Sequence, residues 1–198
     1  MEYDDVLNFW FGTLDAAGCA DAAHAERWWK KNQSFDDELR QRFGTLHEAI
    51  ANGDHDDWLK TPRGRLAYVI ALDQFSRNLF RDSPRMYAYD AKALGAARKG
   101  VAASVDKALA HDERIFLYMP FEHSEELADQ ALCITLFARM CEGLSGDALK
   151  RAQDNVTYAR RHHDIVKRFG RFPHRNRILN RASTPEEAQF LTEPGSSF

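Results

Sequence analysis

Signals that begin α-helices recur along the chain, and they constrain its fold more than any other feature of the sequence. Thr61 precedes Pro62 at the start of an apolar helical pattern, as an N-cap precedes the first helical residue. Thr184 and Glu187 have the spacing of a capping box, and Ser34 is predicted to cap a third helix. Patterns of alternating apolar and polar residues, which would predict β-strands, are essentially missing.

The sequence therefore predicts an all-α fold of seven to ten helices, packed as antiparallel helical hairpins in a tetratricopeptide-like array. The aromatic, alanine and leucine spacing of residues 87–100 is common in one helix of a tetratricopeptide unit. No linker divides the 198 residues, so we predict a single all-helical domain over residues 1–192. Residues 193–198 are predicted to be a frayed tail.

The charge and cysteine content limit the partners and the compartment. A net charge of −3 argues against a nucleic acid or an anionic membrane as partner, because both favour a basic excess. The acidic N-terminus does not resemble a signal peptide, and no apolar run approaches the length of a membrane span. Cys19, Cys133 and Cys141 are odd in number and widely spaced, which predicts thiols in a reducing cytoplasm.

Residues 72–81, LDQFSRNLFR, carry charges within an apolar helical pattern. On a helical wheel Asp73 falls inside the apolar arc, and Arg77, four residues on, is its nearest candidate partner. One interpretation is a buried structural salt bridge. The other is that Arg77 or Arg81 binds an anionic ligand while Asp73 holds Arg77 in place.

A second group of polar residues lies in the segment MPFEHSEELADQ, where a helix is predicted to begin. Glu122, His123 and Glu125 are predicted to supply acid–base groups. The alternative is that carboxylates at a helix start complement the helix dipole without a chemical role.

A third group lies between residues 149 and 177. His163 falls on the apolar stripe of a long predicted helix, where it is either a hydrogen-bonded core residue or an acid–base group. After the glycine that ends this helix, His174, Arg175 and Asn176 are suited to bind a phosphate or carboxylate. The alternative is a solvated basic loop that caps helix ends.

The chain shows none of the common cofactor motifs. HExxH and paired-cysteine spacings are missing, so we predict no metal. GxGxxG, Walker and GxSxG patterns are missing as well, and we predict no cofactor.

Several segments, in order, resemble one bacterial family of a domain of unknown function. They are FWFG, LDQFSRNLFR, PFEHSE followed by LADQ, RFPHRNRIL and STPEEAQFL, and the match runs from Val6 to Leu191. Asn180 stands where the family has glycine, and both residue types can take a left-handed turn. The resemblance implies an all-helical, tetratricopeptide-like fold. It implies no activity.

Two functional hypotheses follow. The first is a binding site for a small anionic metabolite, formed by the three polar groups, and whether it catalyses a reaction is left open. The second is a scaffold that binds a protein or peptide partner and has no catalytic activity. Adjacent Trp28 and Trp29 cannot both face one core, and an exposed tryptophan predicts a homodimer interface.

Overall fold

The computed structural model describes residues 1–197, which form helices, short helical turns and loops, with no strand among them. The predicted all-α fold is thereby confirmed. The chain divides into two compact units, the first made of residues 1–81 and 85–120 and the second of residues 82–84 and the chain from 121 onward. One domain over residues 1–192 stays a prediction.

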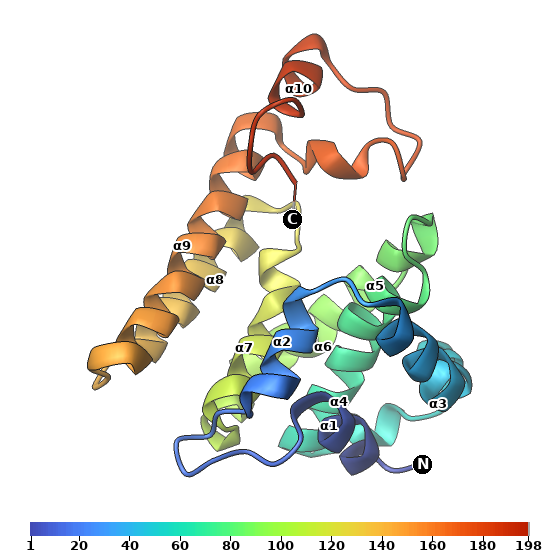
Figure 1. The fold of residues 1–198 in the computed structure, drawn as a ribbon, viewed down its shortest axis with the longest axis vertical. Helices are drawn as coiled ribbons and strands as arrows, with labels where there is room; N and C mark the ends of the chain where they lie inside the picture. Colours follow the sequence, from blue (N-terminus) through green and yellow to red (C-terminus); the bar gives the residue numbers. More distant parts are fainter. Residues whose placement is uncertain (198) are drawn as a thin grey trace. The chain divides into compact units, whose positions relative to one another are not determined.

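The first unit holds most of the helices and helical turns of the chain (Figure 1). In chain order they are α1 (Tyr3–Phe11), α2 (Ala22–Trp29), α3 (Gln33–Asn52), η1 (Asp56–Lys60), α4 (Pro62–Ile70), η2 (Ala71–Phe75), α5 (Ser76–Leu79), η3 (Pro84–Tyr87), α6 (Asp90–Ala102), η4 (Val105–Ala108) and α7 (His111–Glu122). The last residues of α7 and the first of η3 belong to the second unit.

Helix α4, the turn η2 and helix α5 form one continuous helical segment at the centre of the first unit. Helices α1 and α6 pack against α4, and α3 packs against η2 and α5. The side chains from Leu66 to Leu72 are fully buried or nearly so. Residues 66–76 of this segment are buried on every side of the helix, which explains why the apolar pattern is so wide.

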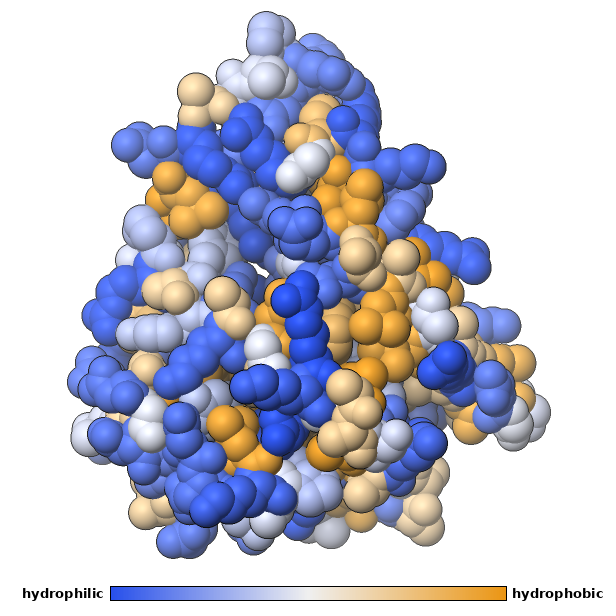
Figure 2. Space-filling view, turned by 180° about the vertical axis from the view of Figure 1, so that it is seen from behind, coloured by the Kyte–Doolittle hydropathy of each residue, from blue (hydrophilic) through white to orange (hydrophobic). Residues whose placement is uncertain are grey.

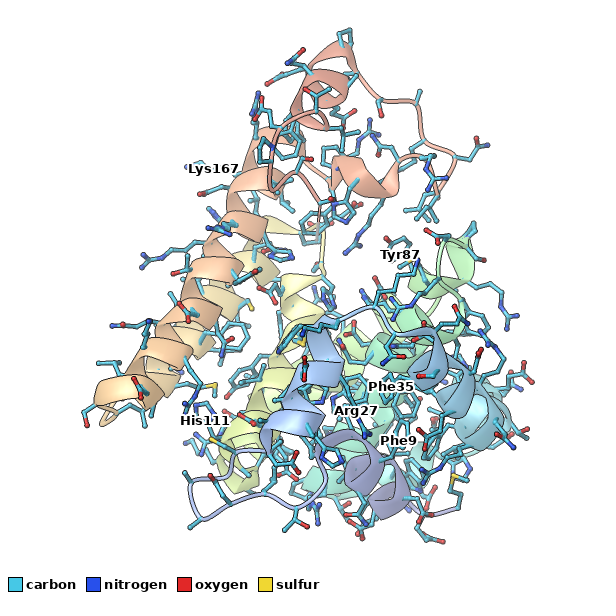
Figure 3. The ribbon with its side chains drawn as sticks, in the orientation of Figure 1. Phe9, Arg27, Phe35, Tyr87, His111 and Lys167 are labelled. Atoms are coloured by element: carbon cyan, nitrogen blue, oxygen red, sulfur yellow. The ribbon has the colours of Figure 1, made fainter. Side chains whose placement is uncertain are left out.

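Aromatic residues fill the space between α1, α3 and this central segment. The rings of Phe9 and Phe35, labelled in Figure 3, stack with centroids 5.2 Å apart. Phe43 lies 4.8 Å from Phe9 and 5.3 Å from Phe75, and Trp10 lies 5.7 Å from Phe75. Offset and edge contacts at these distances add to the free energy of burial, so this cluster anchors α1 on the unit.

Most of the predicted helix starts are found where the sequence placed them. The hydroxyl of Thr61 accepts from the backbone N–H of Gly64, and Thr184 forms a capping box with Glu187. The predicted cap at Ser34 is wrong. Asn32 caps α3 instead, because its side-chain oxygen accepts from two backbone N–H groups, and Asn is as good a cap as Ser.

The second unit is built on one helical hairpin. Helices α8 (Leu127–Met140) and α9 (Gly146–Phe169) lie side by side and are joined by a short connection (Figure 1). After Gly170, whose φ of +71° ends α9, the chain forms η5 (Pro173–Arg175) and α10 (Pro185–Phe190). Val166, Phe172 and Phe190 form a core where this segment packs on the end of α9.

Tryptophans 28 and 29 differ in exposure, as expected for neighbours on a helix. Trp28 is partly buried and donates from Nε1 to the carbonyl oxygen of Trp10 at 2.9 Å. Trp29 is 60% exposed. The homodimer interface stays a prediction.

Polar and apolar residues both reach the face of the molecule seen in Figure 2. Figure 2 shows hydrophilic residues over most of one face, with hydrophobic residues gathered in smaller groups between them. No helix among the described residues combines the length and apolarity needed to cross a bilayer. The three cysteines form no disulfide in the part of the chain that the structure describes. The cytoplasmic location stays a prediction.

Candidate functional site

Asp73 lies in a π-helical turn at the centre of the first unit. Residues 71–75 form this turn, η2, between two α-helical segments. Asp73 is completely buried, as the helical wheel predicts, and Oδ2 accepts a hydrogen bond of 2.5 Å from Nε2 of Gln74. π-Helical turns are rare and are frequent at functional sites, so this turn marks the segment as unusual.

Arg77 pairs with Asp73, and it pairs with a second carboxylate as well. Its Nη1 donates to the carbonyl oxygen of Asp73 at 2.6 Å and lies 3.2 Å from Oδ1 of the same residue. Nη1 and Nη2 also donate to the two carboxylate oxygens of Asp90, at 3.0 and 3.1 Å. Burial disfavours the charge of Arg77, but the two carboxylates outweigh it and raise its pKa.

Arg81 is held by a different carboxylate, that of Asp36. Its Nε donates to one oxygen of Asp36 and its Nη2 to the other, the second at 3.0 Å. Asn78 donates to Oδ1 of the same buried carboxylate at 2.8 Å. Both arginine forks of this segment are thus directed at carboxylates of their own unit. Binding of an anion by Asp73, Arg77 and Arg81 stays a prediction.

In the second unit, His162 takes the buried position that the sequence assigns to His163. Nδ1 of His162 lies 3.0 Å from the carbonyl oxygen of Tyr158 and 3.4 Å from Oε1 of Glu122. His163 is partly exposed. The predicted burial of His163 is wrong, because the segment after α9 packs on the side of the helix that carries His162 and Ile165.

The ring of Phe172 is surrounded by basic side chains. Its centroid lies 5.6 Å from that of His162 and 5.5 Å from that of His174, and the guanidinium carbon of Arg175 stands 4.5 Å above it. His162 and Arg175 are buried, and His174 is partly exposed. We refer to these four residues as the Phe172 cluster.

The two histidines of the Phe172 cluster have strongly lowered pKa values. Burial lowers the pKa of His162 to about 3, with smaller effects from His123, Arg175 and His174 in the same direction. Burial, followed by Arg175, lowers the pKa of His174 to about 4. Both imidazoles are therefore neutral at pH 7, and each can donate from one ring nitrogen and accept at the other.

Glu125 and Asn176 hold the loop that carries the cluster. Glu125 accepts from the backbone N–H of Phe172 at 2.8 Å and from both terminal nitrogens of Arg181, at 2.7 and 3.0 Å. Asn176 donates to Glu187 and accepts from Nε of Arg181. The pKa of Glu125 is lowered, since these hydrogen bonds outweigh its burial. Acid–base work by Glu125 and ligand binding by Asn176 stay predictions.

The left-handed turn expected at Asn180 is present, with a φ of +53°. It allows the backbone N–H of Arg181 to bond back to the carbonyl oxygen of Asn176 at 2.8 Å. This turn sets the Arg181 side chain toward Glu125.

Sequence reasoning missed Gln130, which fixes the turn that follows α7. This fully buried side chain donates from Nε2 to the carbonyl oxygens of Glu122 and Ser124, at 2.6 and 2.7 Å. Next to it, Asp129 accepts from the hydroxyl of Ser124 at 2.6 Å. The signal was present, because Asp129 and Gln130 are the last two residues of the LADQ segment that carries the family resemblance.

Glu187 is another buried carboxylate of the second unit, and the effect of replacing it on stability should be measurable. It accepts from Nε and Nη2 of Arg171, at 2.6 and 2.8 Å, and from the backbone N–H of Thr184. The hydrogen bonds from Arg171 are the main reason that the pKa of Glu187 falls to about 2. We expect Glu187→Gln to lower the unfolding free energy at pH 7 by about 2 kcal/mol, because bonds to a charged group are lost.

The same variant should change the pH dependence, measured by urea unfolding. A carboxylate with a lowered folded-state pKa stabilises above its unfolded pKa of about 4.5, and this stabilisation is lost as the pH falls toward 2. Glu187→Gln should remove that part of the wild-type curve. The exposed neighbour Glu186 provides the control, because Glu186→Gln should change stability at pH 7 by less than about 0.5 kcal/mol. Equal losses in both variants would contradict the assignment.

Comparison with known proteins agrees with the resemblance seen in the sequence. Residues 6–195 match the family model of a bacterial protein of unknown function, DUF924. The structure of the protein of unknown function ATU0120 from Agrobacterium tumefaciens is similar, with a TM-score of 0.77 and 37% sequence identity. That match covers 96% of each chain. A search of the curated proteins found no match.

Proposed function

We propose that this chain, which belongs to the bacterial protein family of unknown function DUF924, binds a small anionic ligand at the Phe172 cluster. The observation that carries the proposal is the burial of Arg175 beside two neutral imidazoles on one short loop. Arg175 stacks on Phe172, and a guanidinium held in this way loses little freedom when it binds a carboxylate or phosphate.

Electrostatics favours an anion here over a cation. After burial, the charge of Arg175 is a further cause of the low pKa values of His162 and His174, so a positive charge lies close to both imidazoles. A bound anion would reverse this effect and would accept hydrogen bonds from the imidazole N–H groups. His174, the partly exposed member, would meet the ligand first.

Acid–base chemistry on such a ligand is the further part of the proposal. Glu122 is buried with Oε1 3.4 Å from Nδ1 of His162, so a small shift of either side chain on ligand binding would bring the carboxyl group and the imidazole within reach for proton exchange. His123 lies near enough to influence both histidines of the cluster. Glu125 and His163 are the remaining acid–base candidates.

The test is a thermal-shift screen with phosphate and carboxylate metabolites. At a hundredfold excess over its dissociation constant, a ligand adds about 2.7 kcal/mol to the free energy of unfolding. For a chain of this size that corresponds to a rise in Tm of about 5–10 °C. Arg175→Lys keeps the charge and loses the planar fork, so we expect most of the ligand-dependent shift to disappear.

Arg177 offers the matched control, because it is an exposed arginine two residues further along. Arg177→Ala should retain the wild-type shift. Arg175→Ala tests the charge itself, and only the ligand-dependent difference in Tm counts, since loss of the stacked guanidinium also weakens packing. The proposal fails if wild type responds to none of the anions, or if Arg175→Lys responds as strongly as wild type.

A second candidate is a tetratricopeptide-like scaffold for a protein or peptide partner. The observation that favours it is the α8–α9 hairpin with partly exposed apolar side chains, Leu127 and Leu132 on α8 and Tyr158 on α9. In that case the buried polar groups would only fix how the helices pack. This candidate gains if the screen finds no ligand and if Leu132→Glu abolishes binding to a captured partner.

A further inference from the structure

The loop between α1 and α2 is fixed onto the start of α7, within the first unit. The backbone N–H of Asp112 donates to the carbonyl oxygen of Gly18 at 3.0 Å, and the N–H of Ala20 donates to Oδ2 of Asp112 at 2.8 Å. Gly18 has a φ of +78°, and a Cβ there would lie 2.7 Å from the backbone nitrogen of His111. The close approach requires glycine, and it places Cys19 beside α7.

Three possible metal ligands meet at this point. The side chains of Cys19, His111 and Asp112 offer one ligand atom each, and these atoms lie within 4.8 Å of one another. Nδ1 of His111, labelled in Figure 3, lies 3.1 Å from Oδ1 of Asp112. Asp112 is buried and the other two are partly buried. A helix start explains an aspartate, but it does not explain a thiol and an imidazole beside it.

The spacing suits a small divalent cation. Two N or O ligands at 2.0–2.1 Å from one zinc ion are about 3.3 Å apart at the tetrahedral angle, close to the observed imidazole–carboxylate separation. The three ligand atoms lie within 4.8 Å of one another, so no pair is more than about 1.5 Å further apart than two ligands of one zinc ion. Small side-chain rotations on metal binding would remove this difference.

We propose that Cys19, His111 and Asp112 form a zinc site. Sulfur, imidazole nitrogen and carboxylate oxygen together favour Zn²⁺ over Mg²⁺ or Ca²⁺, which prefer oxygen ligands alone. Three protein ligands leave a fourth position for water, as in zinc sites that bind substrates. The N–H of Ala20, bonded to Oδ2, leaves Oδ1 of Asp112 to face the ion and fixes the orientation of the carboxylate. The site is independent of the Phe172 cluster, so either proposal can fail alone.

The test is titration of the metal-free full chain with Co²⁺, followed by displacement with Zn²⁺. We expect one Co²⁺ per chain, with the intense visible bands of tetrahedral geometry and a sulfur-to-cobalt charge-transfer band that Zn²⁺ removes. Cys19→Ser should abolish the charge-transfer band. His111→Ala should weaken Zn²⁺ binding at least about 100-fold, because changes to outer ligand partners alone cost 10–100-fold.

Cys141 supplies the matched control, because it is also a partly buried thiol. Cys141→Ser should keep the wild-type spectrum and affinity. Zn²⁺ should also slow alkylation of Cys19 in the wild-type chain without slowing that of Cys141, a measurement that needs no variant to fold. Absence of a stoichiometric tetrahedral Co²⁺ spectrum, equal loss of the band in both cysteine variants, or Cys19 alkylation that Zn²⁺ does not change would overturn the site.

Discussion

Lowering the pH from 7 to 5 should lower the free energy of unfolding by about 2 kcal/mol for each of two buried histidines, His47 and His162. This value follows from the difference between their pKa values in the folded and unfolded chain. Burial, helped by Arg85, lowers the pKa of His47 to about 4, and burial lowers that of His162 to about 3. In the unfolded chain both pKa values are near 6.5. Below pH 6.5 the unfolded state therefore binds protons that the folded state does not bind, and stability is lost progressively from about pH 7 down to the folded pKa values of about 4 for His47 and about 3 for His162.

The environment of His47 explains why it stays neutral. The ring is fully buried in the first unit, with Nε2 at 2.8 Å from the hydroxyl of Ser76. The ring centroids of Phe80 and Tyr89 each lie 5.3 Å from that of His47, in edge contacts. Among the described residues, Nδ1 of His47 has no hydrogen-bond partner. A protonated ring would bring a positive charge into this apolar setting and near Arg85, so the ring stays neutral.

Urea unfolding at pH 7, 6 and 5 checks the prediction. His47→Gln can keep a hydrogen bond to Ser76 but does not titrate, so it should be less stable than wild type at pH 7 and lose about 2 kcal/mol less on going to pH 5. The pH dependence of His162→Gln should be flattened in the same way. An acid response in these variants as steep as that of wild type would show that other groups cause the loss.

The sequence predicted secondary structure well where a local signal decides it. The caps at Thr61 and Thr184 depend on a side chain and a backbone N–H three residues apart, so the chemistry is visible in the sequence. At α3, Asn32 and Ser34 are both good caps, and propensity alone could not choose between them. The same limit applies to His162 and His163. Both positions are compatible with the apolar periodicity of the helix, so the sequence could not decide which of them is buried.

The candidate sites were predictable only in part, because their partners are distant in sequence. The burial of Asp73 and its pairing with Arg77 follow from a spacing of four residues. The bidentate pairing of Arg77 with Asp90 spans an irregular turn, and no periodicity extends across it. Glu125 and Arg181 are 56 residues apart, and their contact depends on how the loop after α9 folds back. Pairs of this kind need tertiary structure.

Replacing Arg77 by methionine should lower the free energy of unfolding by about 3–5 kcal/mol, the usual cost of removing one partner from a buried ion pair. Asp73, completely buried, would lose the cation that lies 3.2 Å from its Oδ1, and Asp90 would lose a bidentate partner. Methionine fills a similar volume, so the loss would report the charge and its hydrogen bonds more than a cavity.

Two measurements distinguish loss of the buried ion pair from simple loss of packing in Arg77→Met: the pH dependence of its stability, and the stability of a double variant. The deficit of Arg77→Met should shrink on acidification relative to wild type, because protonation neutralises carboxylates that have lost their cation. Asp73→Asn combined with Arg77→Met should be more stable than Arg77→Met alone, since the buried charge is gone. Lys30→Met, which removes an exposed partner of Glu26 in the same unit, should leave stability unchanged within error. A double variant no more stable than the single one would place the cost in packing, and the role of Asp73 and Arg77 as a charge pair would have to be abandoned.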